Sequence, residues 1–342
     1  MAITTLDGVI AGMLPPQEFY KIGAGTQVIG RKYSTAYAAG YPGVMTAPAG
    51  GLQGLGLTSK AGSLSFANPG AGNSYLAKLA SEAILPGTLL LCDRLWENSG
   101  NSSTSTGTQT HTLAISAASV ANPTQITVAA HGQAAGTFVV HIVSSTTTPT
   151  INGTWTATYV DGTHFTIPVN VTNTGTATCH IAIPPRDENG TAVGSSGSPT
   201  KYGDGVMMAY EVSGLMGAGT PTFNLNYINQ DGTAKAATVQ TLATTMILGA
   251  FIEIPLAAGD TGVRAITDHI KNATQTSGTY HLIMYRVIAR VGVPVAGAGY
   301  AVDAVTAGLP RMYDNTVPFL LWVPGSTTAP SIISGQMIVT QG

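Results

Sequence analysis

Charged side chains are scarce in this sequence. Asp, Glu, Lys and Arg make up 9% of the 342 residues, whereas soluble domains usually carry about 25%. A surface with so little charge hardly repels other copies of the chain, and free proteins generally use scattered charge to stay apart. The composition therefore favours a component of an assembly. A secreted or naturally Thr-rich β protein is the alternative.

Runs of Lys or Arg and long apolar stretches are also missing. The formal net charge is −2, so we expect neither nucleic acid nor an anionic membrane as a partner. The N-terminus lacks the basic start and unbroken apolar stretch of a signal peptide, and no run of about 18 apolar residues follows. We expect a soluble chain that is made in the cytoplasm.

Cysteine is nearly absent. Cys92 and Cys179 are the two cysteines, too few for a disulfide framework or a zinc motif. Cys92 lies in the apolar run LLLCDRLW, which predicts a small buried hydrophobe rather than a reactive thiol. We expect no cofactor and no metal ion.

The first 72 residues are rich in Gly, Pro, Ala and Tyr and show no sustained period. A disordered tail would be short of aromatic residues, so we expect residues 1–72 to form an extended arm. It lies either over its own core or over a neighbouring subunit. Five aromatic residues are the candidates for a subunit interface: Phe19, Tyr20, Tyr33, Tyr37 and Tyr41.

Residues 73–86 are the one segment with helical spacing. Asn73 or Ser74 can cap a helix, and apolar residues recur at Leu76, Leu79 and Ala83 before a Pro-Gly stop. The pattern predicts a short helix of about three turns that covers the open end of a β structure.

The rest of the chain is predicted to form strands. Turn-forming residues separate eight β-rich segments in the C-terminal half, and Asp231-Gly232 indicates a tight hairpin. Evenly spaced short strands predict an all-β fold, a jelly-roll-like β-sandwich. The eight segments are residues 206–212, 223–228, 237–242, 251–256, 263–270, 280–288, 319–323 and 336–340.

Two low-complexity linkers, residues 100–109 and 189–199, bracket a different unit. Five short β-rich segments lie between them, enough for a small barrel. We therefore expect three parts: an arm (1–72), a core sandwich (73–110 and 186–342) and an inserted small β-barrel (111–185).

The motifs that could carry chemistry are incomplete. Asp260-Thr261-Gly262 matches the triplet of aspartic proteases, but that reaction needs a second carboxylate and only one such triplet is present. Histidines gather in the inserted unit without a zinc-ligand spacing, so we expect solvated or locally hydrogen-bonded side chains. These histidines are His111, His131, His141, His164 and His180. We predict no enzymatic activity.

Several segments resemble a group of tailed-bacteriophage virion proteins. They are residues 1–13 (MAITTLDGVIAGM), 89–100 (LLLCDRLWENSG), 256–266 (LAAGDTGVRAI), 301–324 (AVDAVTAGLPRMYDNTVPFLLWVP) and 333–342 (ISGQMIVTQG). In that group the region after DRLWENSG is usually short, so this chain departs from the pattern by an insertion. The resemblance implies a structural protein of a virion.

The insertion has a resemblance of its own. HGQAAGTFVVHI and INGTWTATYVDGTHFTI are similar to the small β-barrel (FCCH-like) named after the first catalytic-cysteine half-domain of ubiquitin-activating enzymes. Such modules occur on the surface of phage structural proteins. No ubiquitin chemistry follows, because no catalytic motif surrounds Cys179.

Together these observations predict a capsid decoration or minor capsid protein in the virion. Its expected partners are the major capsid protein and copies of itself, as a homotrimer, since a closed ring leaves no interface unsatisfied. A host-surface glycan, bound through the inserted module, is a further candidate partner. A binding protein of the tail or tail fibre is the first alternative, and a virion-associated hydrolase is the second.

Overall fold

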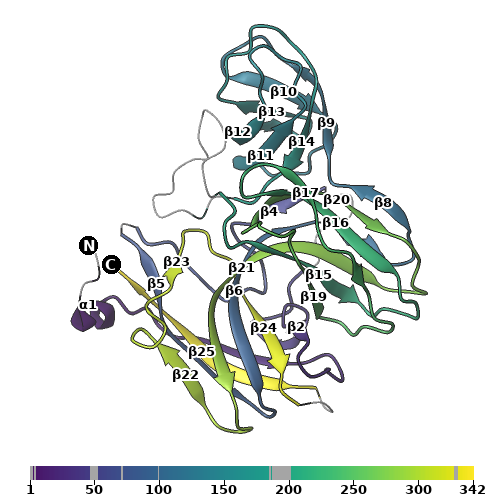
Figure 1. Ribbon diagram of the computed structural model, residues 1–342. Coiled ribbons are helices and arrows are strands. Elements are labelled where there is room, and N and C mark those ends of the chain that lie inside the picture. The colour runs from purple at the N-terminus through teal and green to yellow at the C-terminus, as the bar shows by residue number, and fades with distance from the viewer. Residues whose placement is uncertain are drawn as a thin grey trace.

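The computed structural model describes residues 3, 5–46, 53–70, 72–98, 100–184, 186, 202–326 and 330–342. Within that part the chain forms strands and one short helix, α1 (Leu6–Ala11), whose first turn is capped by the Thr5 hydroxyl. The prediction of an all-β sandwich fold is confirmed. Figure 1 shows a broad body of stacked sheets from which a small barrel projects at one end.

An eight-stranded sheet forms the middle of the body. Because β21 pairs with both β15 and β6, six of its strands close into a ring. Cys92, Phe251, Tyr285 and Phe319 fill part of its interior. In order, the strands are β4 (Leu55–Gly56), β6 (Gly87–Glu97), β24 (Pro318–Pro324), β2 (Lys32–Ser34), β19 (Ala250–Ile254), β15 (Met207–Gly214), β21 (Thr279–Val293) and β7 (Asn101–Ser102).

A six-stranded sheet packs on one flank of this ring. Leu79, Met337, Leu89 and Trp322 belong to the apolar layer between the two sheets. Burying such a side chain fully stabilises the fold by about 1.5–3 kcal/mol. The strands are β22 (Tyr300–Asp303), β5 (Ser74–Ala83), β25 (Ile332–Gln341), β1 (Gln17–Ile22) and β3 (Ala39–Tyr41), with β23 (Arg311–Met312) beside β5.

A five-stranded sheet packs on the other flank. Phe223 and Leu225 on it share a cluster with Met208, Tyr210 and Tyr280 of the central sheet. The predicted Asp-Gly hairpin is present, with Gly232 at φ +81°. The strands are β17 (Ala234–Ala236), β16 (Thr222–Asn229), β20 (Val263–Lys271) and β8 (Gly107–Thr110), with β18 (Gln240–Thr241) beside β16.

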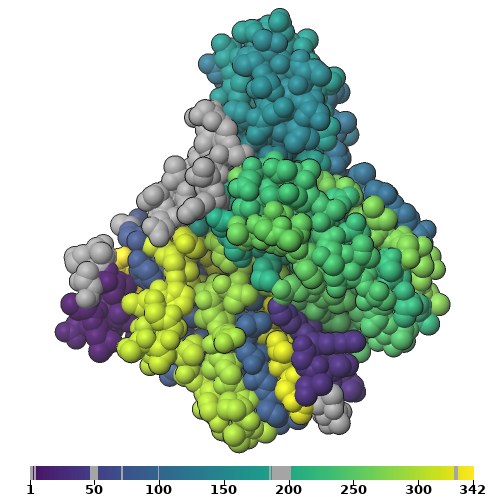
Figure 2. Space-filling model, viewed as in Figure 1, coloured from purple at the N-terminus to yellow at the C-terminus, as the bar shows by residue number. Residues whose placement is uncertain are grey.

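The projecting unit is a closed six-stranded barrel (Figures 1 and 2). Alternate residues such as Val140, Trp155, Phe165 and Cys179 fill it. Five strands overlap the predicted segments, and β9 is a sixth. In order around the barrel they are β10 (Thr124–Val128), β13 (His164–Ile167), β12 (Gly153–Asp161), β11 (Thr137–Val143), β14 (Ala177–Ile181) and β9 (Leu113–Ala118).

The helix predicted over residues 73–86 is wrong, because this segment is strand β5. Leu76 and Leu79 both face the apolar layer, three residues apart as in a helix. They do so because Ala77 is an extra residue: Lys78 pairs with Ile338 and Leu76 with Val339. A β-bulge changes the alternation by one position and so reproduces helical spacing.

The N-terminal segment is built into both large sheets. β1 pairs with β25 and β3, and β2 lies between β24 and β19. Of the two positions expected for the arm, the structure places these strands over the chain's own core. The pairing is between residues far apart in sequence, so no local pattern indicates it.

The first predicted linker is also corrected. Residues 101–102 and 107–110 form β7 and β8, and the Lys271 ammonium donates to the Ser103 carbonyl. Threonine favours strands as well as polar loops. The low-complexity sequence of residues 100–109 therefore gave no sign that parts of it pair as strands. The second predicted linker, residues 189–199, lies outside the described residues.

Candidate functional site

The five aromatic residues predicted at a subunit interface divide into two groups. Phe19 and Tyr33 are buried in the chain's own core, and Tyr37 stacks on His281 with ring centres 6.0 Å apart. Tyr20 and Tyr41 are 44% and 60% exposed and lie opposite each other on β1 and β3. Of the five, only these last two expose their rings to solvent, and their role in an interface stays a prediction.

A buried lysine holds the loop that carries Tyr41. The Lys21 ammonium donates to the carbonyl oxygens of Ala38 (3.3 Å), Pro42 (2.5 Å) and Gly43 (3.2 Å). Its side chain is enclosed, and burial lowers its pKa to about 8. These contacts hold the backbone on both sides of Tyr41. Sequence reasoning missed Lys21.

Exposed apolar side chains are distributed unevenly. Among the described residues, the body carries most of the large hydrophobic side chains that face solvent, and the barrel carries Val120 and Val160. Many of those on the body precede residue 45. They are Leu6, Ile10, Met13, Tyr20, Ile22, Val28, Ile29, Tyr41 and Val44. The N-terminal segment thus gives the body a surface suited to contact with protein.

A buried ion cluster lies at one end of the ring interior. Arg94 donates to Glu97 (2.8 Å) and to Glu211 (2.7 Å), and Lys60 contacts the other oxygen of Glu97. Burial alone would raise the pKa of Glu211, but Arg94 lowers it below its usual value. Burial lowers the pKa of the neighbouring His281 to about 4. The cluster joins β6 to β15 through charge-assisted hydrogen bonds.

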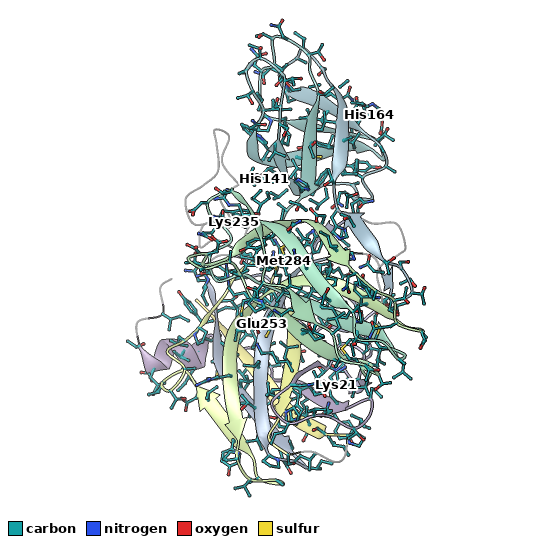
Figure 3. All side chains as sticks on the ribbon, turned by 45° about the vertical axis from the view of Figure 1, so that its right-hand side comes forward. Lys21, His141, His164, Lys235, Glu253 and Met284 are labelled. Atoms are coloured by element: carbon teal, nitrogen blue, oxygen red, sulfur yellow. The ribbon has the colours of Figure 1, made fainter. Side chains whose placement is uncertain are left out.

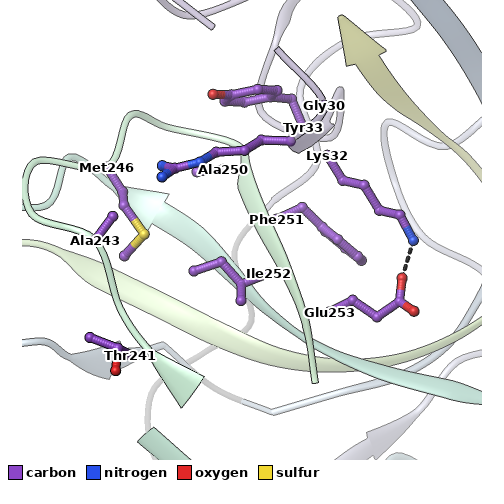
Figure 4. A pocket seen from close by; sticks show the side chains of 11 residues that line it. Gly30, Lys32, Tyr33, Thr241, Ala243, Met246, Ala250, Phe251, Ile252 and Glu253 are labelled. Atoms are coloured by element: carbon purple, nitrogen blue, oxygen red, sulfur yellow. Dashed lines mark hydrogen bonds and ion pairs between the residues drawn. The ribbon is translucent and has the colours of Figure 1, made fainter. Parts of the chain in front are cut away.

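A hollow of about 340 Å³ opens where β2 meets β19 (Figure 4). Met246, Phe251 and Ile252 give it apolar walls, and Lys32 is paired with Glu253 at one side. The Tyr285 hydroxyl donates to the same carboxylate at 3.0 Å. The described lining residues place no nucleophile beside a base, so the hollow is suited to holding a small amphipathic group rather than to covalent chemistry.

Asp260 of the protease-like triplet lies in the turn between β19 and β20. Its carboxylate accepts hydrogen bonds from the Tyr227 hydroxyl (2.5 Å) and the Asn229 amide (2.8 Å). The next two backbone amides donate to the Gln230 side chain. These contacts bind the turn to the β16–β17 hairpin, so Asp260 has a structural role in this fold.

The five predicted histidines lie at different places on the barrel. His164 bonds to Asp161 on its surface, and His131 bonds to the Asp161 carbonyl. His111, His141 and His180 lie where the barrel meets the body, and His111 bonds to His269 of β20. No group of three or more metal-ligating side chains is found in the described part of the chain. Sequence reasoning missed His269, which is 158 residues from His111.

The fold and these sites define an all-β protein that shows weak similarity to viral capsid proteins. One similar structure is that of infectious bursal disease virus, Gx strain, with 8% identity, TM-score 0.13, and coverage of 82% of this chain and 84% of that chain. A second is the crystal structure of the infectious bursal disease virus VP2 subviral particle, with 10% identity, TM-score 0.15, and coverage of 81% and 82%. These scores are too low to establish a shared fold.

No protein-family model matches the chain, and no curated protein matches it. Among the described residues, no helix is long and apolar enough to cross a membrane.

Proposed function

We propose that this protein is a structural component of a tailed-phage virion, a decoration or minor capsid protein that binds the outer shell as a trimer. Its body contacts the major capsid protein and neighbouring copies, and its barrel points away from the shell. The sequence resemblances of residues 89–100 and 301–324 support this assignment.

The observation that carries the proposal is the division of exposed apolar side chains between the two parts of the molecule. Tyr41, Leu6 and Ile29 are exposed on the body, whereas the described surface of the barrel shows only Val120 and Val160 among its large hydrophobic side chains. Apolar side chains on one part favour burial of that part against protein. The barrel, which projects from the body in Figure 2, then remains in solvent.

Binding to purified shells that lack the protein tests this arrangement. The double variant Tyr20→Ser, Tyr41→Ser should bind at least about tenfold more weakly, because truncating a buried interface tyrosine costs more than about 1.4 kcal/mol. Both rings are exposed in the free chain, so the melting temperature should hardly change.

The matched control is the double variant Val120→Ser, Val160→Ser on the barrel, which should bind shells as the unmodified chain does. Equal binding by both double variants would contradict the proposed orientation. Binding to isolated tails instead of shells would favour the tail-associated alternative.

A further inference from the structure

The barrel meets the body along a narrow seam. Strands β11 and β14 of the barrel face β20 of the body, and the chain enters the barrel at His111. A small apolar patch lies within the seam, composed of Val139, Ala182, Ile228 and Ala265. Because this apolar patch is small, polar groups make up much of the seam.

Three of the seven histidines of the chain, His111, His141 and His180, lie at this seam, and a fourth, His269 of β20, bonds to His111 from inside the body. All four are buried. Figure 3 shows His141 at the base of the barrel, whereas His164 lies farther from the body. The seam therefore concentrates the one side chain whose ordinary pKa lies near neutral pH.

Hydrogen bonds connect these histidines across the seam. His111 Nε2 bonds to His269 Nδ1 at 2.9 Å, and His269 Nε2 bonds to the Tyr280 hydroxyl at 2.7 Å. His180 Nδ1 is 3.3 Å from both the His111 carbonyl oxygen and the Thr112 hydroxyl. His141 is the cross-strand neighbour of His180 and bonds to the Thr154 hydroxyl at 2.8 Å.

The charges that face these histidines are mostly positive. Arg264 approaches Thr154 beside His141, and Lys271 lies on the His269 side. Among the described residues, Asp268 is the one carboxylate that acts on a seam histidine, His180. If His111 and His269 were both protonated, two positive rings would lie side by side, which makes the doubly charged form unfavourable while the seam is closed.

Burial supports the same conclusion for each histidine. It lowers the pKa of His111 and His141 to about 4 and that of His269 to about 3, and it lowers that of His180 as well. In the closed seam all four rings are therefore neutral at pH 7.

We propose that the seam is a proton-sensitive joint, which holds the barrel against the body while the four histidines are neutral and opens when they take up protons. The barrel itself stays folded, because its interior is made of apolar residues such as Val140, Ile142 and Phe165. Acidification thus frees the projecting module without unfolding it.

The direction of the pH effect follows from the lowered pKa values. In the open seam the rings return to an ordinary pKa of about 6.5, so the open form binds more protons below that pH. The closed form is fully favoured above about pH 6.5 and loses stability as the pH falls toward 4. The opening constant rises by up to about tenfold per pH unit for each histidine that titrates.

Hydrogen exchange of the full chain between pH 7 and pH 4, corrected for the intrinsic rate, tests the joint. The amide of Ile183 donates across the seam to the Arg264 carbonyl. The logarithm of its protection factor should fall with decreasing pH, with a slope of up to four, one proton for each histidine. Amides within the β11–β12 and β15–β21 ladders should keep their protection over the same pH range.

The informative variant is His141→Asn with His180→Asn, because asparagine can replace the Nδ1 hydrogen bond of each ring without titrating. The double variant should reduce the slope of protection against pH by about two protons, whereas the control His164→Asn should leave this slope unchanged. An unchanged slope in the double variant would overturn the proposal. Loss of protection in all ladders at the same pH would also overturn the proposal, because it would indicate global acid unfolding.

Discussion

At the scale of single residues, the buried carboxylates of the described part, Asp93, Glu97 and Glu211, are each paired with a cation. Arg94 lies between Glu97 and Glu211, and its guanidinium also packs over the Phe319 ring at 5.7 Å. In a chain with few charges, placing these ions inside the ring is costly unless each one is matched. Arg94 is therefore the side chain on which the cluster depends most.

Replacing Arg94 by methionine should lower the free energy of unfolding by about 3–5 kcal/mol at pH 7, since it leaves the buried Glu211 without its cation and Glu97 with Lys60 alone. The deficit should shrink at pH 5. In the variant the pKa of Glu211 rises, because Arg94 no longer offsets its burial, so this carboxyl group becomes neutral at a higher pH. The unmodified chain meanwhile begins to lose the benefit of its lowered Glu211 pKa.

Urea denaturation at both pH values measures this difference. Arg290→Met is the matched control, because Arg290 is exposed on β21 and no ion pair of it is found among the described residues. Equal losses in the two variants would show that the cluster does not stabilise the ring.

The sequence predicted some residue environments and not others. A buried Cys92 was predicted from its apolar neighbours and is confirmed. The Arg94–Glu211 pair was not predictable, because the two residues are 117 positions apart and meet only when the ring closes. The His111–His269 pair was not predictable either, because 158 positions separate the two residues.

At the scale of elements, β-rich segments bounded by turn residues were predictable as strands, even where their pairing is irregular. β16 was predicted almost to its ends, and so was β20, although the pairing of these two strands carries two register shifts. β5 carries a bulge and was predicted as a helix. β6 is buried on both faces, so its apolar run has no period that distinguishes a strand from a helix.

Single-residue deletions in β5 distinguish a bulged strand from a helix. Removing Ala77 should cost less than about 2 kcal/mol, because it removes the extra residue and leaves Leu76 and Leu79 facing the apolar layer. Removing Ala80 should cost more than about 4 kcal/mol, because it turns both leucines to solvent. Thermal denaturation measures both losses. A tolerated Ala80 deletion, or equal losses, would contradict the bulge.

At the scale of the whole molecule, the fold consists of a body with many pairings distant in sequence and a barrel whose strands follow one another in the chain. The barrel's strands lie within one continuous stretch, so its existence could be predicted from local patterns. The body's ring needs β2 to lie between β24 and β19, and only tertiary packing decides that order.

The most direct test of the proposed virion role is electron cryomicroscopy of intact particles that contain this protein. We predict density for the body seated on the outer shell around threefold positions, with the barrel pointing away from the shell. Density confined to the tail, or a shell with no density that fits the body, would contradict the account.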